Sequence, residues 1–203
     1  MEFKFFTGGP LATNAWFLET GSGNLLFDAP EGADRHFAGN RIDWLVLTHG
    51  HFDHVMDAAA IHRRHGCRVA CHPDTIPMVA DGRFFSKLGF PYEFEPVTAD
   101  CQLTEGGIEP VEGVPMRVLE VPGHCPGSLC FYFASLECVV GGDVLFQEGV
   151  GRWDLPGGDG RLLLDGIRGK LFTLPEQTRV LPGHGPETTI AHEKRHNPYV
   201  SGD

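Results

Sequence analysis

Residues 48–54 read T-H-G-H-F-D-H and hold the side chains of this chain that are best suited to chemistry. Four of them can bind a metal ion: His49, His51, Asp53 and His54. Histidine and carboxylate ligands without a thiolate favour zinc, iron or manganese in an open site over a closed structural zinc centre. Alternate side chains of an extended chain point the same way, so His49 and His51 are expected on one side. Asp53 and His54 fall where a helix could begin, so one short turn offers ligands for two adjacent metal sites.

Three more candidate ligands come later in the chain, each directly after a glycine: His124, Asp143 and His184. Glycine lets the backbone bend sharply, so each side chain can face inward from the end of a strand. Taken singly, each could be an ordinary loop residue, and the histidines of residues 48–54 could lie on a polar surface. Together they make seven candidate ligands at the ends of four predicted strands. In an α/β protein, the sheet edge where strands end is where a site is built.

Buried strands must position these residues, and apolar runs predict four strands just before the candidate ligands, at residues 42–47, 116–121, 138–140 and 178–181. Other strands are predicted at residues 3–6, 14–18, 24–27, 67–71 and 129–133, and helices at residues 55–65, 161–172 and 187–196, with a short helix from Pro73. Residues 81–96 are predicted as a long aromatic loop that either covers a substrate or packs on the core, and residues 105–110 as a turn. No linker divides the chain, so we expect one domain spanning residues 1–203.

The composition indicates a globular protein without an affinity for polyanions. Acidic residues outnumber basic ones by 27 to 16, for a formal net charge of −11. The sequence has no basic stripe, which argues against nucleic acid or an anionic membrane surface as a partner. The six cysteines form no C-x-x-C pair, so we expect reduced thiols in a cytoplasmic protein. The N-terminus has no signal-peptide pattern, and no apolar run reaches membrane length.

The ordered motifs resemble those of a known family. T-H-G-H-F-D-H followed by P-G-H, G-D and P-G-H-G, in this order, resembles the metallo-β-lactamase superfamily. The pattern G-D-V-L-F…G-R-x-D-L-P-G-G-D, with the ending N-P-Y, is similar to the glyoxalase II (hydroxyacylglutathione hydrolase)-like branch. The likeness covers nearly the whole chain, and its ligand set is far more specific for the superfamily than for a substrate. It implies an α/β fold, a four-layer αβ/βα sandwich of two facing sheets with helices outside.

The resemblance also implies which residues would hold which metal. One ion would be bound by His49, His51 and His124, a second by Asp53, His54 and His184, and Asp143 would bridge both. The ions would be divalent, with zinc first and iron or manganese as alternatives. Two such ions about 3.5–4 Å apart lower the pKa of a shared water towards about 7, so that hydroxide can attack a thioester carbonyl.

Four residues receive supporting or catalytic roles. Asp53 would orient the hydroxide as well as bind metal. Asp28 ends a predicted strand, where it either supports a ligand histidine or caps a turn. Arg152 and Asp154 are close enough in sequence to pair and hold the loop after Asp143, a role favoured over direct contact with the substrate. The implied partner is a small-molecule substrate, an anionic thioester, for a monomer or homodimer.

Two features depart from the glyoxalase II pattern. Full-length enzymes of that branch carry an additional C-terminal helical domain, and we expect it to be absent because only 19 residues follow His184. Trp153 stands where the branch usually has threonine. Both departures weigh against a glutathione thioester as the substrate, but not against the hydrolytic site.

Two other functions compete with the metal-dependent thioesterase. The first is a mononuclear-iron enzyme like the persulfide dioxygenases of the same superfamily, with iron at the positions of His49, His124 and Asp143. The Gly-Arg-x-Asp loop occurs in both branches, so it does not separate them. The second is a non-catalytic metal-binding module, which the complete set of seven ligands disfavours because degenerate members are expected to lose ligands.

Overall fold

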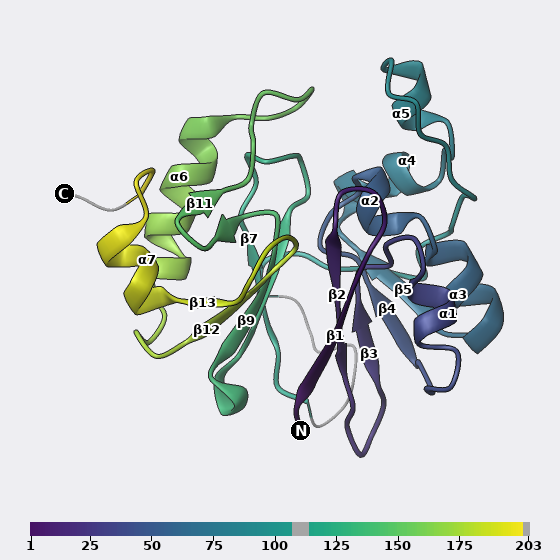
Figure 1. Ribbon diagram of the computed structural model, residues 1–203, viewed down its shortest axis with the longest axis horizontal. Helices are drawn as coiled ribbons and strands as arrows, with labels where there is room; N and C mark the ends of the chain where they lie inside the picture. Colours follow the sequence, from purple (N-terminus) through teal and green to yellow (C-terminus); the bar gives the residue numbers. More distant parts are fainter. Residues whose placement is uncertain (107–113, 201–203) are drawn as a thin grey trace.

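Two β-sheets face one another in the computed structural model, which describes residues 1–106 and 114–200 (Figure 1). In these ranges the first sheet has six strands in sequence order: β1 (Phe3–Gly8), β2 (Thr13–Leu18), β3 (Leu25–Phe27), β4 (Trp44–Val46), β5 (Arg68–Cys71) and β6 (Cys101–Gln102). The second, within the same ranges, has five strands in the order β13-β12-β9-β8-β7: β7 (Arg117–Glu120), β8 (Leu129–Phe133), β9 (Cys138–Gly142), β12 (Arg179–Pro182) and β13 (Thr188–Thr189). A separate hairpin pairs β10 (Leu145–Phe146) with β11 (Gly149–Val150).

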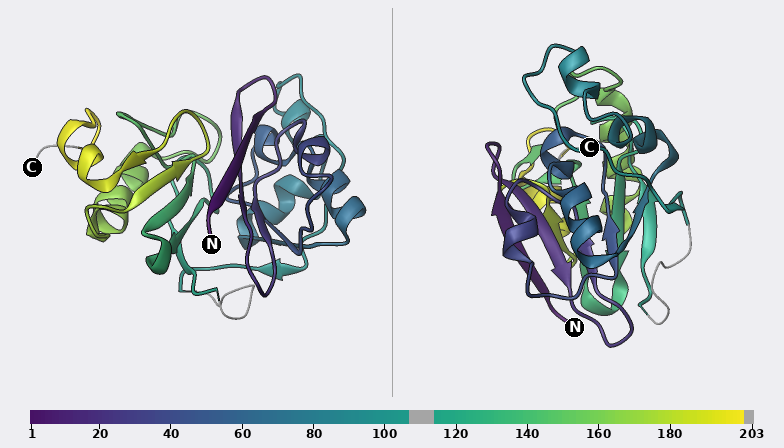
Figure 2. Two further views of the ribbon diagram at one scale, coloured as in Figure 1. Left: turned by 60° about the horizontal axis from the view of Figure 1, so that its bottom comes forward. Right: turned by 90° about the vertical axis from the view of Figure 1, so that its right-hand side faces the viewer.

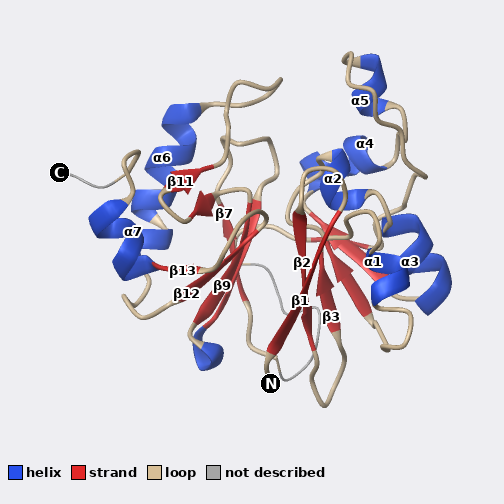
Figure 3. Cartoon of the chain, viewed as in Figure 1, coloured by secondary structure: helices blue, strands red, loops and turns tan. Residues whose placement is uncertain are grey.

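Helices cover the outer face of each sheet (Figures 1 and 3). The N-terminal half contributes α1 (Ala33–His36), α2 (Phe52–Val55), α3 (Ala58–His65), α4 (Ile76–Val79) and α5 (Phe84–Lys87). The C-terminal half contributes α6 (Gly160–Gly169) and α7 (Ile190–His196), on the opposite side of the molecule (Figure 2). Single 3₁₀ turns lie at Pro73–Thr75, Ala134–Leu136 and Leu171–Thr173. The four-layer α/β sandwich predicted from the sequence is therefore confirmed.

Three layers of buried apolar side chains lie between the four layers of helices and sheets. Successive side chains of a strand point into alternate apolar layers. In β4, Trp44 and Val46 point into the layer between the sheets, while Leu45 points towards the helices of the N-terminal half. In β12, Leu181 enters the same central layer and Val180 packs towards the helices of the C-terminal half. Such strands are buried on both faces, which is why they appear in the sequence as short continuous apolar runs.

The strand directions bring the candidate ligands to one edge of the sandwich. In the second sheet β8 runs antiparallel to β7 and β9, and β12 runs parallel to β9. The strands β7, β9 and β12 therefore all end at the same edge. His124, Asp143 and His184 follow these three ends, and His49 follows the end of β4 in the facing sheet.

Several predicted elements differ in extent from the observed ones. Residues 187–196 were predicted as one helix, but Thr188–Thr189 first pairs with β12, and α7 begins only after Thr189, whose side chain accepts a hydrogen bond from His192 N. The predicted loop at residues 81–96 contains α5. The predicted helix at residues 161–172 ends at Gly169, and strand β6 was not predicted because two residues carry no periodic signal. Part of the predicted turn at residues 105–110 lies outside the described residues.

Among the residues described, no helix has both the length and the apolar character needed to cross a membrane.

The central apolar layer is expected to dominate stability. Phe131 is fully buried there, with its ring centroid 5.2 Å from that of Phe27 in the facing sheet. Phe131→Ala removes a large buried ring and leaves a cavity, so the free energy of unfolding should fall by about 3–5 kcal/mol. Chemical denaturation of the purified protein measures this change. The matched control Leu162→Ala, on the exposed side of α6, should change it by no more than about 0.5 kcal/mol.

Candidate metal centre

The seven candidate ligands lie together at the ends of strands from both sheets. Ligand atoms of His49, His51 and His124 lie within 4.8 Å of one another, as do those of Asp53, His54 and His184. Asp143 lies between the two groups: its Oδ1 is 3.2 Å from His54 Nε2, and its Oδ2 is 3.3 Å from His184 Nε2 and 3.6 Å from His124 Nε2. Residues up to 135 positions apart in the sequence thus form one cluster.

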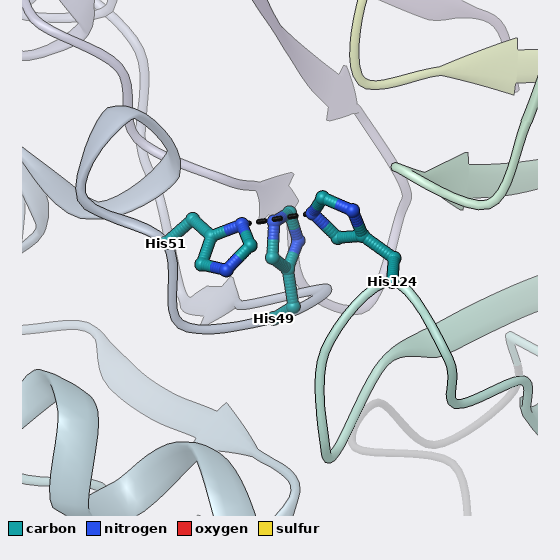
Figure 4. Close-up of side chains that lie close together, drawn as sticks. All are labelled: His49, His51 and His124. Carbon is teal, nitrogen blue, oxygen red and sulfur yellow. Dashed lines mark hydrogen bonds between the residues drawn. The ribbon is translucent and has the colours of Figure 1, made fainter. Parts of the chain in front are cut away.

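The first group consists of three imidazole rings that pack edge to face (Figure 4). His51 Nδ1 lies 2.8 Å from His124 Nε2, and the His49 ring stands close to both, with centroid distances of 4.8 and 4.9 Å. His49 and His51 come from the turn between β4 and α2, and His124 comes from the loop between β7 and β8. All three side chains are buried.

Hydrogen bonds outside the cluster orient four of the five rings in the same way. His124 Nδ1 donates to the carbonyl of Arg152 at 2.7 Å, and His184 Nδ1 donates to the carbonyl of Leu11 at 3.1 Å. A carbonyl can only accept, so each ring holds its proton on Nδ1 and turns Nε2 towards the cluster. His54 donates in the same way to Asp28, and His49 Nδ1 lies 3.0 Å from the hydroxyl of Thr48.

Asp28 supports this arrangement through hydrogen bonds to Thr48 and His54. It is buried, and its Oδ1 accepts from Thr48 N at 2.8 Å while its Oδ2 accepts from the Thr48 hydroxyl and from His54 Nδ1, both at 2.7 Å. Ligand atoms of Asp28, His49 and His54 also lie within 4.8 Å of one another. Since both oxygens of Asp28 are already occupied, we interpret it as a support for His54 and, through Thr48, for His49. Asp28 adopts a φ of 61°, a left-handed conformation that places its carboxylate between two elements.

The electrostatics divide the histidines into neutral and protonated ones. Burial lowers the pKa of His49 well below its ordinary value, with the charges of His54 and His51 adding to the effect. Burial, helped by the charge of His124, lowers the pKa of His51 to about 3. Burial likewise lowers the pKa of His124, although the charge of Asp143 opposes it. These three rings are therefore neutral at pH 7, the state in which imidazole binds a metal.

The second group has the opposite character in the metal-free chain. Burial would lower the pKa of His54, but the carboxylates of Asp143, Asp53 and Asp28 outweigh it and raise that pKa well above its ordinary value. Burial also acts to lower the pKa of His184, yet hydrogen bonds to Asp143 and Asp53 raise it to about 10. His54 and His184 are therefore protonated, and their positive charges lie beside the carboxylates of Asp53 and Asp143.

The two carboxylates stay ionised for the same reason. Burial would raise the pKa of Asp53, but the charge of His54 and hydrogen bonds from His184 and Thr13 lower it to about 2. Burial would also raise the pKa of Asp143, and His54 and His184 bring it well below its ordinary value. Two neighbouring carboxylates that are shielded from water repel one another, and cations beside them are needed to stabilise their charges.

The polar atoms left without hydrogen bonds indicate what kind of group fits here. Among the described residues, the buried atoms that form no hydrogen bond include His49 Nε2, His54 Nε2 and Asp143 Oδ1; all three face the cluster, and the last two lie 3.2 Å apart as an ion pair without the geometry of a hydrogen bond. Buried polar groups are normally paired, so three such atoms in one place call for an additional ligand. Nitrogen and oxygen donors without thiolates suit a divalent transition metal, and the residues present fit such ions.

Several residues of the site carried no recognisable signal in the sequence. The Thr13 hydroxyl donates to Asp53 Oδ2 at 2.7 Å, and Thr13 also forms an isolated β-bridge with His184. Asn14 donates from its backbone to Gly183 O and from its side chain to Pro182 O and Gly185 O, at 2.7, 3.1 and 2.9 Å. A threonine and an asparagine at the start of a strand are too common to be singled out without knowledge of the facing loop.

The predicted pairing of Arg152 with Asp154 is present. The guanidinium donates two hydrogen bonds to the carboxylate, at 2.8 and 2.7 Å. The backbone carbonyl of Arg152 is the acceptor for His124 Nδ1, so the loop that carries this ion pair also orients a ring of the cluster. Trp153, between them, packs against Tyr199 with a centroid distance of 6.2 Å.

A cavity of about 420 Å³ opens beside the cluster. Its polar lining consists of the cluster residues His51, Asp53, His124, Asp143 and His184, together with Arg152. The remaining lining residues are apolar or aromatic: Leu11, Phe52, Phe85, Phe90, Tyr92, Phe146 and Leu155. The cavity thus gives a small molecule access to the charged cluster along mainly apolar walls.

The sequence of this chain matches a known family and several known proteins. Residues 8–184 match the model of a family described as "Metallo-beta-lactamase superfamily". A "Probable metallo-hydrolase YqgX" of Bacillus subtilis is 35% identical over 210 residues, covering 100% of this chain and 99% of the relative. A "Hydroxyacylglutathione hydrolase GloC" of Haemophilus influenzae is 35% identical over 160 residues, covering 77% of this chain and 75% of the relative.

Solved structures agree in fold over nearly the whole chain. The BLEG-1 B3 metallo-beta-lactamase superposes with a TM-score of 0.90 at 34% identity, covering 99% of this chain and 100% of that one. TTHA1623, in a di-iron-bound form, has a TM-score of 0.86 at 36% identity, covering 97% and 99%. ETHE1 from Myxococcus xanthus has a TM-score of 0.81 at 27% identity, covering 99% and 85%.

The tight packing of Gly183 predicts that a methyl group there disrupts the cluster. A Cβ at this position would lie 2.1 Å from Asp143 Oδ1 and 2.7 Å from His54 Cε1, so both side chains would have to move. Gly183→Ala should weaken metal binding by at least about 10-fold, as displaced supporting groups do. Metal titration followed by calorimetry measures this. Gly169→Ala is the matched control, since a Cβ there meets nothing within 4 Å; equal affinity in the two variants would contradict the prediction.

The raised pKa of His184 predicts how the metal-free protein responds to pH. The folded-state pKa of about 10 exceeds the unfolded value of about 6.5, so the stabilisation is complete below about pH 6.5 and is lost as the pH rises through 10. With a chelator present, the free energy of unfolding should fall between pH 7 and 10, and more steeply in the wild type than in His184→Gln. The difference between the two proteins isolates His184 from other titrating groups. Parallel curves in urea denaturation would refute the assignment.

Proposed function

Because the chain belongs to the metallo-beta-lactamase superfamily, we propose that it is a metal-dependent hydrolase of the glyoxalase II-like kind, which cleaves a thioester bond. The superfamily and the metallo-hydrolase name of its full-length relative support the hydrolase class. The hydroxyacylglutathione hydrolase among the relatives supports an acyl thioester as the substrate class.

The proposal assigns two metal ions to the cluster. One is held by His49, His51 and His124, the other by Asp53, His54 and His184, with Asp143 shared. The observation that carries this assignment is the position of Asp143, which contacts ligands of both groups: its Oδ1 lies 3.2 Å from His54 Nε2, and its Oδ2 lies 3.3 Å from His184 Nε2 and 3.6 Å from His124 Nε2. A site for one ion would leave Asp53, His54 and His184 without a metal to bind. The di-iron form of TTHA1623 supports a pair of metal ions, for which zinc is the first candidate and iron or manganese are alternatives.

Divalent ions at such a site supply Lewis acidity and make a water acidic enough to serve as a nucleophile at neutral pH. The chain itself provides the orientation. Asp53 is fixed at Oδ2 by the Thr13 hydroxyl, and in the proposal it orients the attacking hydroxide as well as binding metal. The carbonyl of Arg152 fixes His124, and Asp28 fixes His54, so that the ligand atoms do not have to reorganise during the reaction.

The proposed function does not require glutathione as the thiol half of the thioester substrate. In the loop that would face a thiol carrier, Arg152 and Leu155 line the cavity, whereas Trp153 packs on Tyr199. The substitution of threonine by Trp153 therefore lies away from the cavity wall. We expect the enzyme to act on a small anionic thioester in the cytoplasm, where its six free cysteines stay reduced.

A mononuclear-iron dioxygenase is the second candidate, because the Gly-Arg-x-Asp loop occurs in both branches of the superfamily; ETHE1 shares the fold over 99% of this chain at 27% identity. In that case His49, His124 and Asp143 hold one iron. The two candidates differ in metal content and in the use of oxygen, and both differences can be measured.

Metal removal and replacement of one ligand test the proposal. The purified protein should contain two divalent ions per chain, and removing them with a chelator should abolish thioester hydrolysis, which zinc, iron or manganese restores. His51→Ala should lower kcat/KM for a thioester by at least about 100-fold, because an open ligand position weakens both binding and orientation of the metal. Elemental analysis and thiol release measure the two effects.

The control is His196→Ala, which removes an exposed histidine of α7 and should leave activity unchanged. Consumption of oxygen with a persulfide, combined with one iron per chain and no thiol release, would replace the thioesterase by the dioxygenase. A metal-loaded protein that cleaved no thioester, ester, lactone or phosphodiester would restore the non-catalytic alternative.

A further inference from the structure

The cavity wall on the His51 side is built from four aromatic rings that support one another. Tyr92 stacks on Phe52 with a centroid distance of 3.9 Å and an interplanar angle of 10°. Phe85 packs edge-on against Phe52 at 5.6 Å and against Phe90 at 6.2 Å. Phe85 is 5% exposed and lies 5.6 Å from the ring of His51. This aromatic wall, defined as Phe52, Phe85, Phe90 and Tyr92, therefore reaches directly to the metal cluster.

The wall is anchored to the ligand-bearing turn. Phe52 stands between His51 and Asp53 in the sequence, at the start of α2, so its ring is positioned by the same backbone that presents the two candidate ligands. The other three rings come from α5 and the residues after it, a segment that rises above the ends of the strands (Figure 1). A group held against these rings lies next to the reacting centre rather than at a distant part of the surface.

The aromatic wall and the rest of the cavity lining differ in charge. The aromatic wall offers no charged group, and its hydrogen-bonding capacity is limited to the hydroxyl of Tyr92. Outside the wall and the cluster, the lining consists of Leu11, Phe146, Leu155 and Arg152, whose side chain is 60% exposed and already paired with Asp154. A thiol carrier is the larger and more polar half of a thioester, so it suits the part of the lining near Arg152. The compact acyl half then lies against the aromatic wall.

We propose that the acyl group of the substrate is a bulky apolar one, aromatic or branched aliphatic, held by Phe85, Phe90 and Tyr92. This inference rests on the proposed thioesterase function and names the substrate class of the same site. A small or hydroxylated acyl group leaves the rings uncovered or loses hydrogen bonds to water without replacement, whereas an apolar ring removes apolar surface from water on both sides. Aromatic pairs in offset or edge-on arrangements add to this preference.

Thioesters of a single anionic thiol, 3-mercaptopropionate, test the proposal with the metal-loaded full chain. Acetyl, hydroxyacetyl, 3-methylbutanoyl and phenylacetyl thioesters differ only in the acyl group. We expect kcat/KM for the phenylacetyl and 3-methylbutanoyl compounds to exceed that for the acetyl compound by about 10- to 100-fold. Phe90→Ala should remove most of this preference through KM, and the conservative Phe90→Leu should keep part of it.

Leu88→Ala is the matched control, because Leu88 is 46% exposed in the same segment and does not line the cavity. It should keep the wild-type preference. A second readout is independent of turnover: phenylacetate should bind the metal-loaded wild type at least about 10-fold more tightly than acetate, measured by calorimetry, and Phe90→Ala should reduce this ratio. Circular dichroism confirms that each variant is folded.

The outcomes separate this inference from the proposed function. Cleavage of all thioesters without an acyl preference, or with a preference for acetyl, overturns the inference and leaves the thioesterase intact. Absence of any thioester cleavage refutes the thioesterase, and the binding ratio then decides the inference alone. Equal affinity for phenylacetate and acetate overturns it.

Discussion

The structure depends on keeping two carboxylates charged inside the protein. Asp53 and Asp143 lie side by side among buried groups, where an isolated charge is strongly disfavoured. Each carboxylate has partners in its own half of the chain, Thr13 and His54 for Asp53 and His184 and His124 for Asp143, and one more partner in the other half. Asp53 comes from the N-terminal half and meets His184 from the C-terminal half at 3.2 Å, while Asp143 comes from the C-terminal half and meets His54 from the N-terminal half at 3.2 Å. The full set of partners of each carboxylate is therefore assembled only where the two halves meet.

The contacts around the cluster show how the two sheets are held in register. The backbone of Thr48, after β4, accepts a hydrogen bond from Leu129 at the start of β8, at 2.8 Å. Strand β2 binds the loop after β12 through Asn14 and through Trp16, whose indole donates to Pro182 O at 2.9 Å. The aromatic contacts of Phe27 with Phe131 and Phe133 set the separation of the sheets below. Because these links are short and buried, a small shift of one sheet would separate the ligands.

The same arrangement would let an acidic protein accept an anionic substrate of the proposed kind. The net charge of −11 repels anions over the surface in general, but bound cations would concentrate positive charge at one point. In the metal-free chain, protonated His54 and His184 occupy this role. Metal binding therefore has to displace protons, and metal affinity is linked to pH. The aromatic wall beside the cluster excludes water from one side, which strengthens the electrostatic interactions of a bound substrate.

The local pattern of the sequence identified the candidate ligands and the four strands that precede them, because strand ends and ligand types repeat within a few residues. The sandwich of two sheets followed from the family resemblance. The tertiary structure alone decided which residues support the cluster. Thr13 and Asp53 are 40 residues apart and Asn14 and Pro182 are 168 apart, so their contacts depend on how the two sheets pack, which no local periodicity encodes. The aromatic residues of 81–96 were visible in the sequence, but only the packing of Phe85 and Tyr92 on Phe52 turns them into a wall of the cavity, because the direction of a ring is set by its neighbours in space.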